Sequence, residues 1–359
     1  MKILIDAHIF DGKYQGTRTY IKGLYSELIK RNPTWDFFFV ANDIPNLASE
    51  FPNLENVHFI KFKFKNQYIR LIFELPYIIF KRKIDYSHFQ YISPIIKVGK
   101  YIVTNHDILF REKRFKAYFP LLFKLVKSPL FYWSSVNADV LLTVSKYSQE
   151  SISTHYNIPI SRIGITPNSV NASLKGLNEG KRNKNILYVS RIEPRKNHVS
   201  VLKAFVNLKL NEKGYKLIFI GKYDLRYSEY DEFVRENASA LKDSLVTVSG
   251  LTENELVKQY NKAALVVFPS LAEGFGIPPL EAAVMNVKVI CSNATAMKEF
   301  DFFKYHYDPD NQLEFEELIL KAISDDIYPF DKIRNEILSA YNWEYAAKEY
   351  EKRLEGQKE

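Results

Sequence analysis

The sequence predicts an α/β protein of two domains, each built on an open sheet of parallel strands. Short apolar runs alternate with helical patterns along the whole chain, which is typical of parallel βαβ units. The 359 residues are also too many for one ordinary hydrophobic core. Finally, a polar, glycine-containing stretch without apolar periodicity, residues 171–184, interrupts the alternation near the middle of the chain.

The expected domains and elements follow from these patterns. We expect a first domain over 1–170, a linker over 171–184 and a second domain over 185–340. The apolar runs predict strands at 2–8, 37–43, 57–63, 101–107 and 139–145, and then at 186–190, 216–221, 245–250, 264–270 and 287–292. Helical periodicity marks 17–32, 199–208 and 342–356. Ligands of open α/β sheets bind at the carboxyl ends of the strands, so the residues that follow each strand are the candidates for a site.

Composition favours a cytoplasmic protein. The single cysteine, Cys291, excludes an internal disulfide and fits a reducing compartment. Asp6 and His8 interrupt the N-terminal apolar run, which argues against a signal peptide. The most apolar window, 70–80, is broken by Glu74 and by a proline and falls short of the roughly 20 residues of a membrane span.

The net charge of +8 comes with basic residues that interleave with aromatic ones in the first half, at 61–70, 80–83 and 111–119. Solvated lysines on ordinary surfaces are one interpretation, and contact with an anionic membrane surface is another. Nucleic acid is not an expected partner because no helix-turn-helix, zinc or RNP pattern accompanies the charge. We therefore expect a protein that is either free in the cytoplasm or peripheral on the inner face of the membrane.

The stretch "FPSLAEGFGIPPLEAAV", residues 268–284, contains two glutamates around a Gly-Phe-Gly turn. A helix is expected to begin near Pro278, since proline suits a first helical turn. The N–H groups of that turn, together with Gly274 and Gly276, can face an anion such as a phosphate. Glu273 and Glu281 accept hydrogen bonds and can hold the hydroxyls of a sugar or ribose. The alternatives are a helix-dipole effect at Glu281 and a solvated loop at Glu273.

Two cations follow the expected strand at 186–190. Arg191 lies at the strand end, and Lys196 lies just before a helix that Asn197 is expected to cap. Fixed cations beside a helix N-terminus can stabilise a departing diphosphate without a metal. Ordinary surface charge is the alternative for both residues.

Other candidate sites carry weaker signals. Gly16 precedes a helix and could bring backbone amides close to a phosphate. His106 and Asp107 directly follow a strand, where a structural hydrogen-bonded pair is the alternative to a functional histidine. The Asp-x-Asp at Asp308 and Asp310 could suggest a metal-bound diphosphate, but we interpret it as a turn without a strong strand before it, and we expect no metal site.

The chain resembles the retaining glycosyltransferases of family 4, which have the GT-B fold of two Rossmann-like domains around a central cleft. The segments "YVSRIEPRKN", "FIGK", "GLTENELVKQYNKAALVVFPSLAEGFGIPPLEAA" and "VICSNATAMKEF" follow the family pattern in order. In the first half, "TNHDILF", "LLTVSKYSQESI" and "IGITPNSV" fit it. The helix "NWEYAAKEYEKRL" resembles the family's closing segment, so 341–359 is expected to pack back near the first domain.

The resemblance implies roles for individual residues of the second domain. Glu281 matches the ribose-binding glutamate, and Glu273 matches the glutamate that meets the donor sugar beside the reacting carbon. Arg191 and Lys196 match the diphosphate-binding pair. Phe275, with the glycine that follows it, matches the loop amides near sugar and phosphate.

In the first domain, Gly16 matches the N-terminal glycine loop and His106 the histidine near the donor sugar. Two positions depart from the family pattern, because Ser169 and Asn286 stand where a glycine is usual. Asparagine tolerates a left-handed backbone, so Asn286 can still end the helix before it.

The resemblance implies a metal-independent transfer of a hexose, with retention of anomeric configuration, from a nucleotide-diphospho-sugar and without a cofactor. "YIKGLYSELIKRNP" and "HDILFREKRF" come nearest to bacterial mannosyltransferase-like members, which favours GDP-mannose over a UDP-sugar. The expected acceptor is a glycan or lipid-linked saccharide in O-antigen, capsule or exopolysaccharide assembly. The alternatives are a catalytically idle sugar-nucleotide-binding protein and an enzyme that makes a soluble glycoside.

Overall fold

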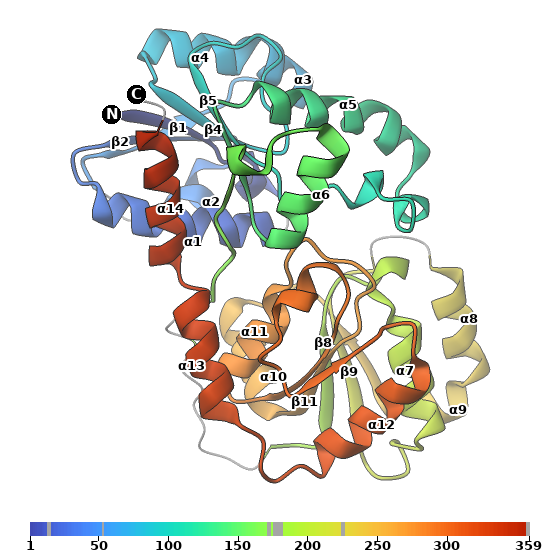
Figure 1. Ribbon diagram of the computed structural model, residues 1–359. Coiled ribbons are helices and arrows are strands. Elements are labelled where there is room, and N and C mark those ends of the chain that lie inside the picture. Colours follow the sequence, from blue (N-terminus) through green and yellow to red (C-terminus); the bar gives the residue numbers. More distant parts are fainter. Residues whose placement is uncertain (13–15, 52–53, 171–173, 175–181, 224–226, 357–359) are drawn as a thin grey trace. The chain divides into compact units, whose positions relative to one another are not determined.

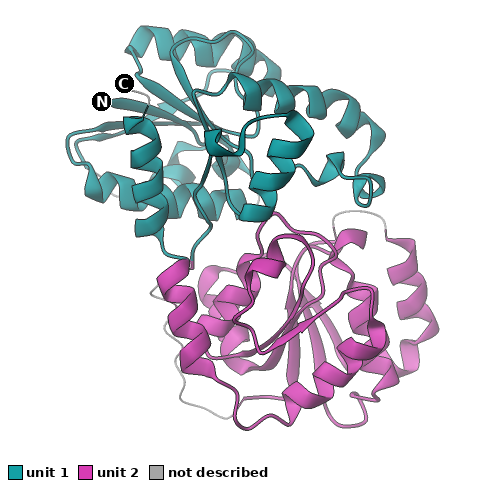
Figure 2. Ribbon diagram, in the orientation of Figure 1, with its two compact units in different colours: residues 1–169, 341–359 teal, residues 170–340 magenta. Residues whose placement is uncertain are grey.

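The computed structural model describes residues 1–359 except 13–15, 52–53, 171–173, 175–181, 224–226 and 357–359. The chain divides into two compact units (Figure 1, Figure 2): unit 1 comprises Met1–Ser169 with Tyr341–Glu359, and unit 2 comprises Val170–Ala340. Most of the expected linker, namely 171–173 and 175–181, lies outside the described residues. No described helix is both long enough and apolar enough to cross a membrane.

Unit 1 is built on a parallel sheet with the strand order β3-β2-β1-β4-β5-β6-β7. Its strands are β1 (Lys2–Asp6), β2 (Asp36–Ala41), β3 (Val57–Lys61), β4 (Tyr86–Gln90), β5 (Lys100–Thr104), β6 (Val140–Thr143) and β7 (Ile163–Ile165). Its helices are α1 (Gly16–Arg31), α2 (Ile44–Ala48), α3 (Gln67–Ile69), the π-helical turn η2 (Arg70–Glu74), α4 (Leu75–Arg82), α5 (Leu121–Asn137), α6 (Lys146–Tyr156) and α14 (Trp343–Glu355). Because all the strands are parallel, the residues that follow them gather at one edge of the sheet.

The closing helix α14 packs beside α1 within unit 1 (Figure 1). The Tyr25 and Tyr350 hydroxyls are hydrogen-bonded at 2.9 Å in the buried contact between them. Arg31 donates to Glu351 at 2.8 Å at the edge of the same contact. The last segment of the chain therefore completes the first sheet's helical cover, although it follows unit 2 in the sequence.

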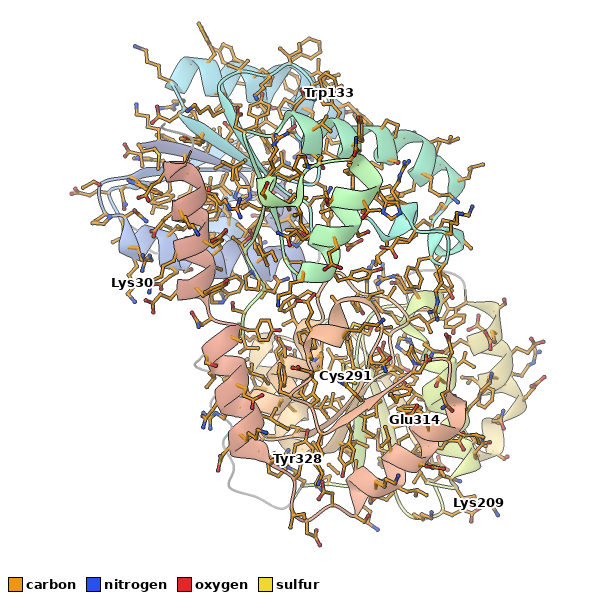
Figure 3. The ribbon with its side chains drawn as sticks, in the orientation of Figure 1. Lys30, Trp133, Lys209, Cys291, Glu314 and Tyr328 are labelled. Atoms are coloured by element: carbon orange, nitrogen blue, oxygen red, sulfur yellow. The ribbon has the colours of Figure 1, made fainter. Side chains whose placement is uncertain are left out.

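Unit 2 is built on a second parallel sheet with the strand order β10-β9-β8-β11-β12-β13. Its strands are β8 (Asn185–Val189), β9 (Lys216–Ile220), β10 (Leu245–Val248), β11 (Ala263–Phe268), β12 (Lys288–Ser292) and β13 (Tyr305–Tyr307). Its helices are α7 (His198–Asn207), α8 (Ser228–Glu236), α9 (Ala238–Leu241), α10 (Glu253–Lys262), α11 (Ile277–Val284), α12 (Gln312–Ile323) and α13 (Phe330–Ala340), with the short turns η6 (Pro194–Lys196) and η7 (Thr295–Glu299). Cys291 is fully buried on β12 (Figure 3), and burial raises the pKa of its thiol.

Two parallel-sheet domains were the predicted fold class, and the structure confirms it. Three strands were not predicted. β7 and β13 have only three residues each, and β4 carries Ser87, His88 and Gln90 between its apolar residues. The sheet buries His88 and Gln90 with hydrogen bonds inside the protein: His88 bonds to Tyr25 at 2.6 Å and to Thr104 at 2.8 Å, and Gln90 bonds to His106 at 2.7 Å.

Local expectations at helix ends had mixed outcomes. Asn286 has a φ of 56° two residues after the end of α11, as predicted for a helix end that lacks glycine. Asn197 occupies the N-cap position of α7, as predicted, but its side chain makes no capping hydrogen bond: its backbone is left-handed and its side chain donates to the Pro309 carbonyl. Asp308 and the turn after it lie between β13 and α12, so the predicted turn is confirmed. The prediction that no strong strand precedes this turn was wrong, because β13 ends directly before it.

Candidate functional site

Two loops of unit 2 meet at the carboxyl edge of its sheet. β8 and β11 are neighbouring strands, so the loop at 190–197 and the loop at 269–276 leave the sheet side by side. The Leu271 N–H donates to the Arg195 carbonyl at 2.9 Å and ties the two loops together. The chain folds this way because the apolar runs of both strands end at a proline or polar residue directly before these loops.

Glu273 lies at the centre of this contact and is buried. Its carboxylate pairs with the Lys196 ammonium and, at 3.3 Å, with the Arg195 guanidinium. Burial raises the pKa of this carboxyl, but the charges of Lys196 and Arg195 outweigh burial and lower the pKa to about 2. Glu273 is therefore ionised at every physiological pH.

The cations around Glu273 are not equivalent. The Lys196 side chain is 11% exposed, and burial together with the neighbouring Arg195 lowers the pKa of its ammonium. The Arg191 side chain is 52% exposed and pairs with Glu193 at 3.7 Å, at the rim of the loop. Of the predicted cation pair, the structure brings Lys196 to Glu273 and leaves Arg191 beside a different carboxylate.

Arg195 and Glu193 were missed by the sequence analysis. The Arg195 side chain donates to Glu193 at 2.6 Å and is ion-paired with Glu273 at 3.3 Å, so it joins both carboxylates. The sequence signal for them was an acidic residue before Pro194 and two basic residues after it, in "EPRK". Since η6 winds Pro194–Lys196 into one tight turn, these neighbouring charges meet in the fold.

A glycine of the neighbouring strand lets this loop lie close to the sheet. Gly221 follows β9, and a Cβ atom there would stand 1.8 Å from the Ser190 carbonyl oxygen. Such a distance is far below van der Waals contact, so any side chain would push residues 190 and 191 away. Gly221, the glycine of "FIGK", therefore allows the backbone of Ser190 and Arg191 to lie close to the end of β9.

The Gly-Phe-Gly turn leads directly into α11. Gly276 has a φ of 109°, a conformation that glycine adopts without strain. Phe275 is buried with its ring 5.6 Å from that of Phe300, and Gly274 is also buried. The Glu273 N–H donates to the Thr295 hydroxyl at 2.8 Å, which anchors the start of the turn. Pro278 occupies the first turn of α11, as predicted.

Glu281 lies on α11, one turn after its start, and is partly buried. The Tyr260 hydroxyl donates to its carboxylate at 2.9 Å. Burial raises the pKa of Glu281 to about 7, against a smaller lowering by the Tyr260 hydrogen bond. The two glutamates of this segment thus differ in charge near neutrality: Glu273 is ionised and Glu281 is half protonated.

Glu281 should make the free energy of unfolding depend on pH. A carboxyl whose pKa rises on folding contributes stability below the unfolded pKa of 4.5, and this stability is lost as the pH rises through the folded pKa of about 7. We expect Glu281→Gln to be more stable than the wild type at pH 8, by up to roughly 3 kcal/mol, and similar to it at pH 4.5. Urea denaturation at the two pH values measures this. The exposed Glu317→Gln on α12 is the control and should show no such difference.

The remaining candidates belong to unit 1. His106 is buried, and its Nε2 is hydrogen-bonded to the Gln90 side chain at 2.7 Å. Burial lowers the pKa of His106 to about 3, so the imidazole is neutral. It does not pair with Asp107, whose carboxylate accepts from the Leu109 N–H. Gly16 is the exposed first residue of α1, and 13–15 before it lie outside the described residues.

Comparison with known proteins gives a consistent result for both halves of the chain. Residues 14–174 match the family model Glycosyltransferase Family 4, and residues 170–341 match the model Glycosyl transferases group 1. The O-antigen chain mannosyltransferase RfbU of Salmonella typhimurium is 33% identical over 202 residues, which cover 55% of this chain and 53% of that protein. The O-antigen chain mannosyltransferase B of Escherichia coli is 32% identical over 176 residues, or 45% of each chain. The matched segments thus span about half the length of these relatives.

The fold is shared with solved structures of low sequence identity. Sucrose-phosphate synthase from Thermosynechococcus elongatus superposes with a TM-score of 0.76 at 15% identity, covering 99% of this chain and 98% of the other. At this identity the similarity concerns the fold alone.

Proposed function

The chain belongs to the family 4 glycosyltransferases of the GT-B fold, and from this premise we propose that it moves a hexosyl group from a nucleotide-diphospho-sugar to a saccharide acceptor. The observation that carries this proposal is the arrangement of Glu273 between Lys196 and Arg195 at the end of β11, beside the N-terminus of α11. Fixed charges of both signs meet there at the edge of a parallel sheet.

This arrangement suits the charges that develop when a sugar leaves a diphosphate. Negative charge grows on the diphosphate, and Lys196, Arg191 and the first N–H groups of α11 can stabilise it. Positive charge grows on the sugar, and the ionised Glu273 can stabilise it while it accepts hydrogen bonds from sugar hydroxyls. Glu281 would hold the ribose. We propose that the transfer retains the anomeric configuration and needs no metal.

Mannose is the proposed sugar and GDP-mannose the proposed donor. Two relatives above 30% identity are named O-antigen chain mannosyltransferases, which supports this choice and supports a role in assembling a bacterial surface polysaccharide. For His106 and Gly16, contact with the donor remains a proposal that rests on the family resemblance.

A membrane-facing acceptor is proposed from the surface of unit 1. Large apolar side chains are exposed on α3, η2, α4 and α5 and in the segment before α3. Together with the exposed Lys63, Lys65 and Lys81, we call them the apolar-basic surface. The apolar members are Phe64, Tyr68, Phe73, Tyr77, Phe80, Leu121, Leu122 and Leu125, and Phe80 is the most exposed at 77%. Lysines with bulky apolar neighbours bind anionic bilayers through charge and burial together. We therefore propose a lipid-linked acceptor and a peripheral position on the inner face of the membrane.

A panel of donors tests the proposed function. Calorimetry with GDP-mannose, other GDP-sugars, UDP-sugars and dTDP-sugars, with and without EDTA, should show binding of a nucleotide-diphospho-sugar that EDTA does not change. Slow release of the nucleoside diphosphate from the bound donor would distinguish an enzyme from an idle binder. Binding that requires a divalent metal would contradict the proposed mechanism, and failure of every donor to bind would contradict the proposal itself.

A further inference from the structure

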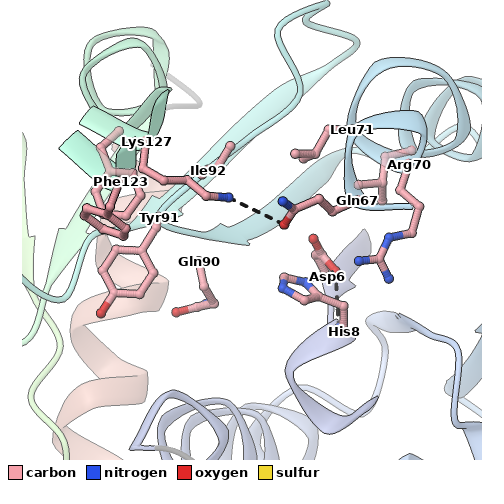
Figure 4. A pocket seen from close by; sticks show the side chains of 12 residues that line it. Asp6, His8, Gln67, Arg70, Leu71, Gln90, Tyr91, Ile92, Phe123 and Lys127 are labelled. Carbon is pink, nitrogen blue, oxygen red and sulfur yellow. Dashed lines mark hydrogen bonds and ion pairs between the residues drawn. The ribbon is translucent and has the colours of Figure 1, made fainter. Parts of the chain in front are cut away.

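A pocket of about 180 Å³ lies at the carboxyl edge of the unit 1 sheet (Figure 4). Its floor is polar and comes from the ends of β1 and β4, with Asp6 and His8 on one side. Its walls are helical, with Arg70 from η2 on one side and Phe123 and Lys127 from α5 on the other. None of the candidate site residues discussed so far lines it.

Arg70 gives this pocket a specific chemistry. The residue is only 8% exposed, and its guanidinium stacks over the Phe62 ring at 4.7 Å. The nearest carboxylate is that of Asp11 at 3.6 Å, beyond hydrogen-bonding distance. Among the described residues, the Arg70 Nη1 has no hydrogen-bond acceptor. A buried charged N–H group without an acceptor is costly, and an oxyanion in the pocket would offset this cost by accepting from it.

Asp11 is the ion-pair partner of Arg70, but its carboxylate hydrogen-bonds to Asn42 and Asp43 and not to Arg70. One oxygen accepts the backbone N–H groups of Asn42 and Asp43 at 2.7 Å each, and the other accepts the Asn42 side chain at 2.6 Å. The second carboxylate near the pocket, Asp6, is used by His8, whose Nδ1 lies 2.8 Å from its oxygen. Neither carboxylate therefore accepts a hydrogen bond from the Arg70 Nη1.

A second cation faces the same space from the opposite wall. Lys127 on α5 lies 3.5 Å from the Gln67 side chain on α3, and the two reach across the pocket (Figure 4). With Asp6 held by His8, Arg70 and Lys127 leave the lining with an excess of positive charge. Phe123 and Leu71 add an apolar part to the wall. The pocket thus suits a small oxyanion that is attached to a less polar group.

The same helices that form the walls carry the apolar-basic surface on their exposed sides. Tyr68 lies directly after Gln67, Phe73 lies three residues after Arg70, and Leu125 precedes Lys127 by two residues. The Lys127 ammonium also lies 5.8 Å from the centre of the Tyr68 ring, so the two walls meet at this surface. One molecule with a charged head and a long apolar tail would use both features.

We propose that this pocket binds the phosphate of a lipid-linked saccharide acceptor, with Arg70 and Lys127 as the phosphate ligands. The proposal rests on the proposed function, since it names the acceptor of that transferase. The saccharide beyond the phosphate would lie along the polar floor, and the lipid would lie along the apolar-basic surface.

Binding to vesicles tests this proposal with the full chain. Phosphatidylcholine vesicles that contain a polyisoprenyl monophosphate should bind the wild type at least tenfold more tightly than vesicles with the same charge density of phosphatidylserine. Lys127→Gln should remove most of this preference. Lys124→Gln, on the same helix but outside the pocket lining, should change it less than twofold. Arg70→Gln should abolish the preference, and its circular dichroism checks folding, whereas Lys127→Gln remains informative if Arg70→Gln does not fold.

Soluble competitors separate the sources of the anion. Inorganic phosphate at millimolar concentration should compete for the pocket, and glucuronate should compete less. Equal binding to both kinds of vesicle, or equal behaviour of Lys127→Gln and Lys124→Gln, would overturn the proposal, as would stronger competition by glucuronate. Binding of the nucleotide sugar is measured separately, by the calorimetry described above. If the protein bound no nucleotide sugar but still preferred vesicles with polyisoprenyl monophosphate, the proposed function would be refuted and the proposed phosphate site would stand.

Discussion

Glu273→Gln is expected to reduce turnover by on the order of 10²- to 10³-fold while nucleotide affinity changes little. The amide keeps the size of the side chain and one hydrogen-bond acceptor for Lys196 and Arg195. It removes the negative charge of the carboxylate, which Lys196 and Arg195 keep ionised by lowering the pKa of Glu273 to about 2. In the proposed reaction, that charge faces the sugar as positive charge develops on it. The loss should therefore appear in kcat and not in the Kd of the nucleoside diphosphate.

A matched control separates this effect from loss of an ion pair in general. Asp325 has a side chain that is 6% exposed and is paired with Lys304 at 2.8 Å in the same unit. Asp325→Asn should lower the free energy of unfolding without lowering kcat in the folded protein. Steady-state kinetics and urea denaturation of both variants make the comparison. If Glu273→Gln kept wild-type turnover, Glu273 would have only a structural role.

Lys196→Gln is expected to lower turnover far more than Arg191→Gln, although the sequence presents the two cations as a pair. Lys196 is buried against Glu273, where a preorganised charge acts in a poorly solvated site, and its loss should reduce kcat on the order of 10²-fold. Arg191 is 52% exposed, so water and salt weaken its field, and its loss should cost roughly tenfold or less.

Salt provides the second readout for this pair. The contribution of Arg191 should shrink as ionic strength rises from about 0.01 to 0.5 M, because salt screens an exposed charge, whereas the contribution of the buried Lys196 should persist. Lys203→Gln on α7 is a control, since its ammonium is exposed and paired with Glu229. Equal kcat values for Lys196→Gln and Arg191→Gln at both salt concentrations would contradict the burial argument.

Much of the fold could be predicted from the chain because parallel strands buried on both faces leave apolar runs. β1, β2, β8, β11 and β12 were found in this way. β4 was missed because its sequence is largely polar. Its His88 is buried through hydrogen bonds to residues that are distant in the sequence, and a local pattern does not indicate such bonds. The α11 segment was predicted well because Pro278 and Asn286 mark its two ends by their own backbone preferences.

The candidate site could be predicted only in part. Residue types and spacing singled out Glu273, Glu281, Lys196 and Arg191, but they did not point to Arg195, which is ion-paired with Glu273. Arg195 lies in the η6 turn, and its contact with Glu273 depends on how the folded loop packs against the loop after β11. The unit 1 pocket was not predicted at all. Arg70 and Lys127 are 57 residues apart in the sequence, and Asp6 and His8 come from the N-terminal part of the chain. Only the packing of these elements in the fold brings the four side chains together.

By itself, the sequence determined the two parallel-sheet domains, the turn that opens α11 and the chemical types of the residues at the ends of β8 and β11, since these depend on local pattern and on the backbone preferences of proline, glycine and asparagine. Only the tertiary structure decided which charges are buried and which are exposed. Burial is set by neighbours distant in the chain, and it makes Glu273 a fixed anion, leaves Glu281 titrating near neutrality and leaves Arg70 with an N–H group that no described side chain satisfies.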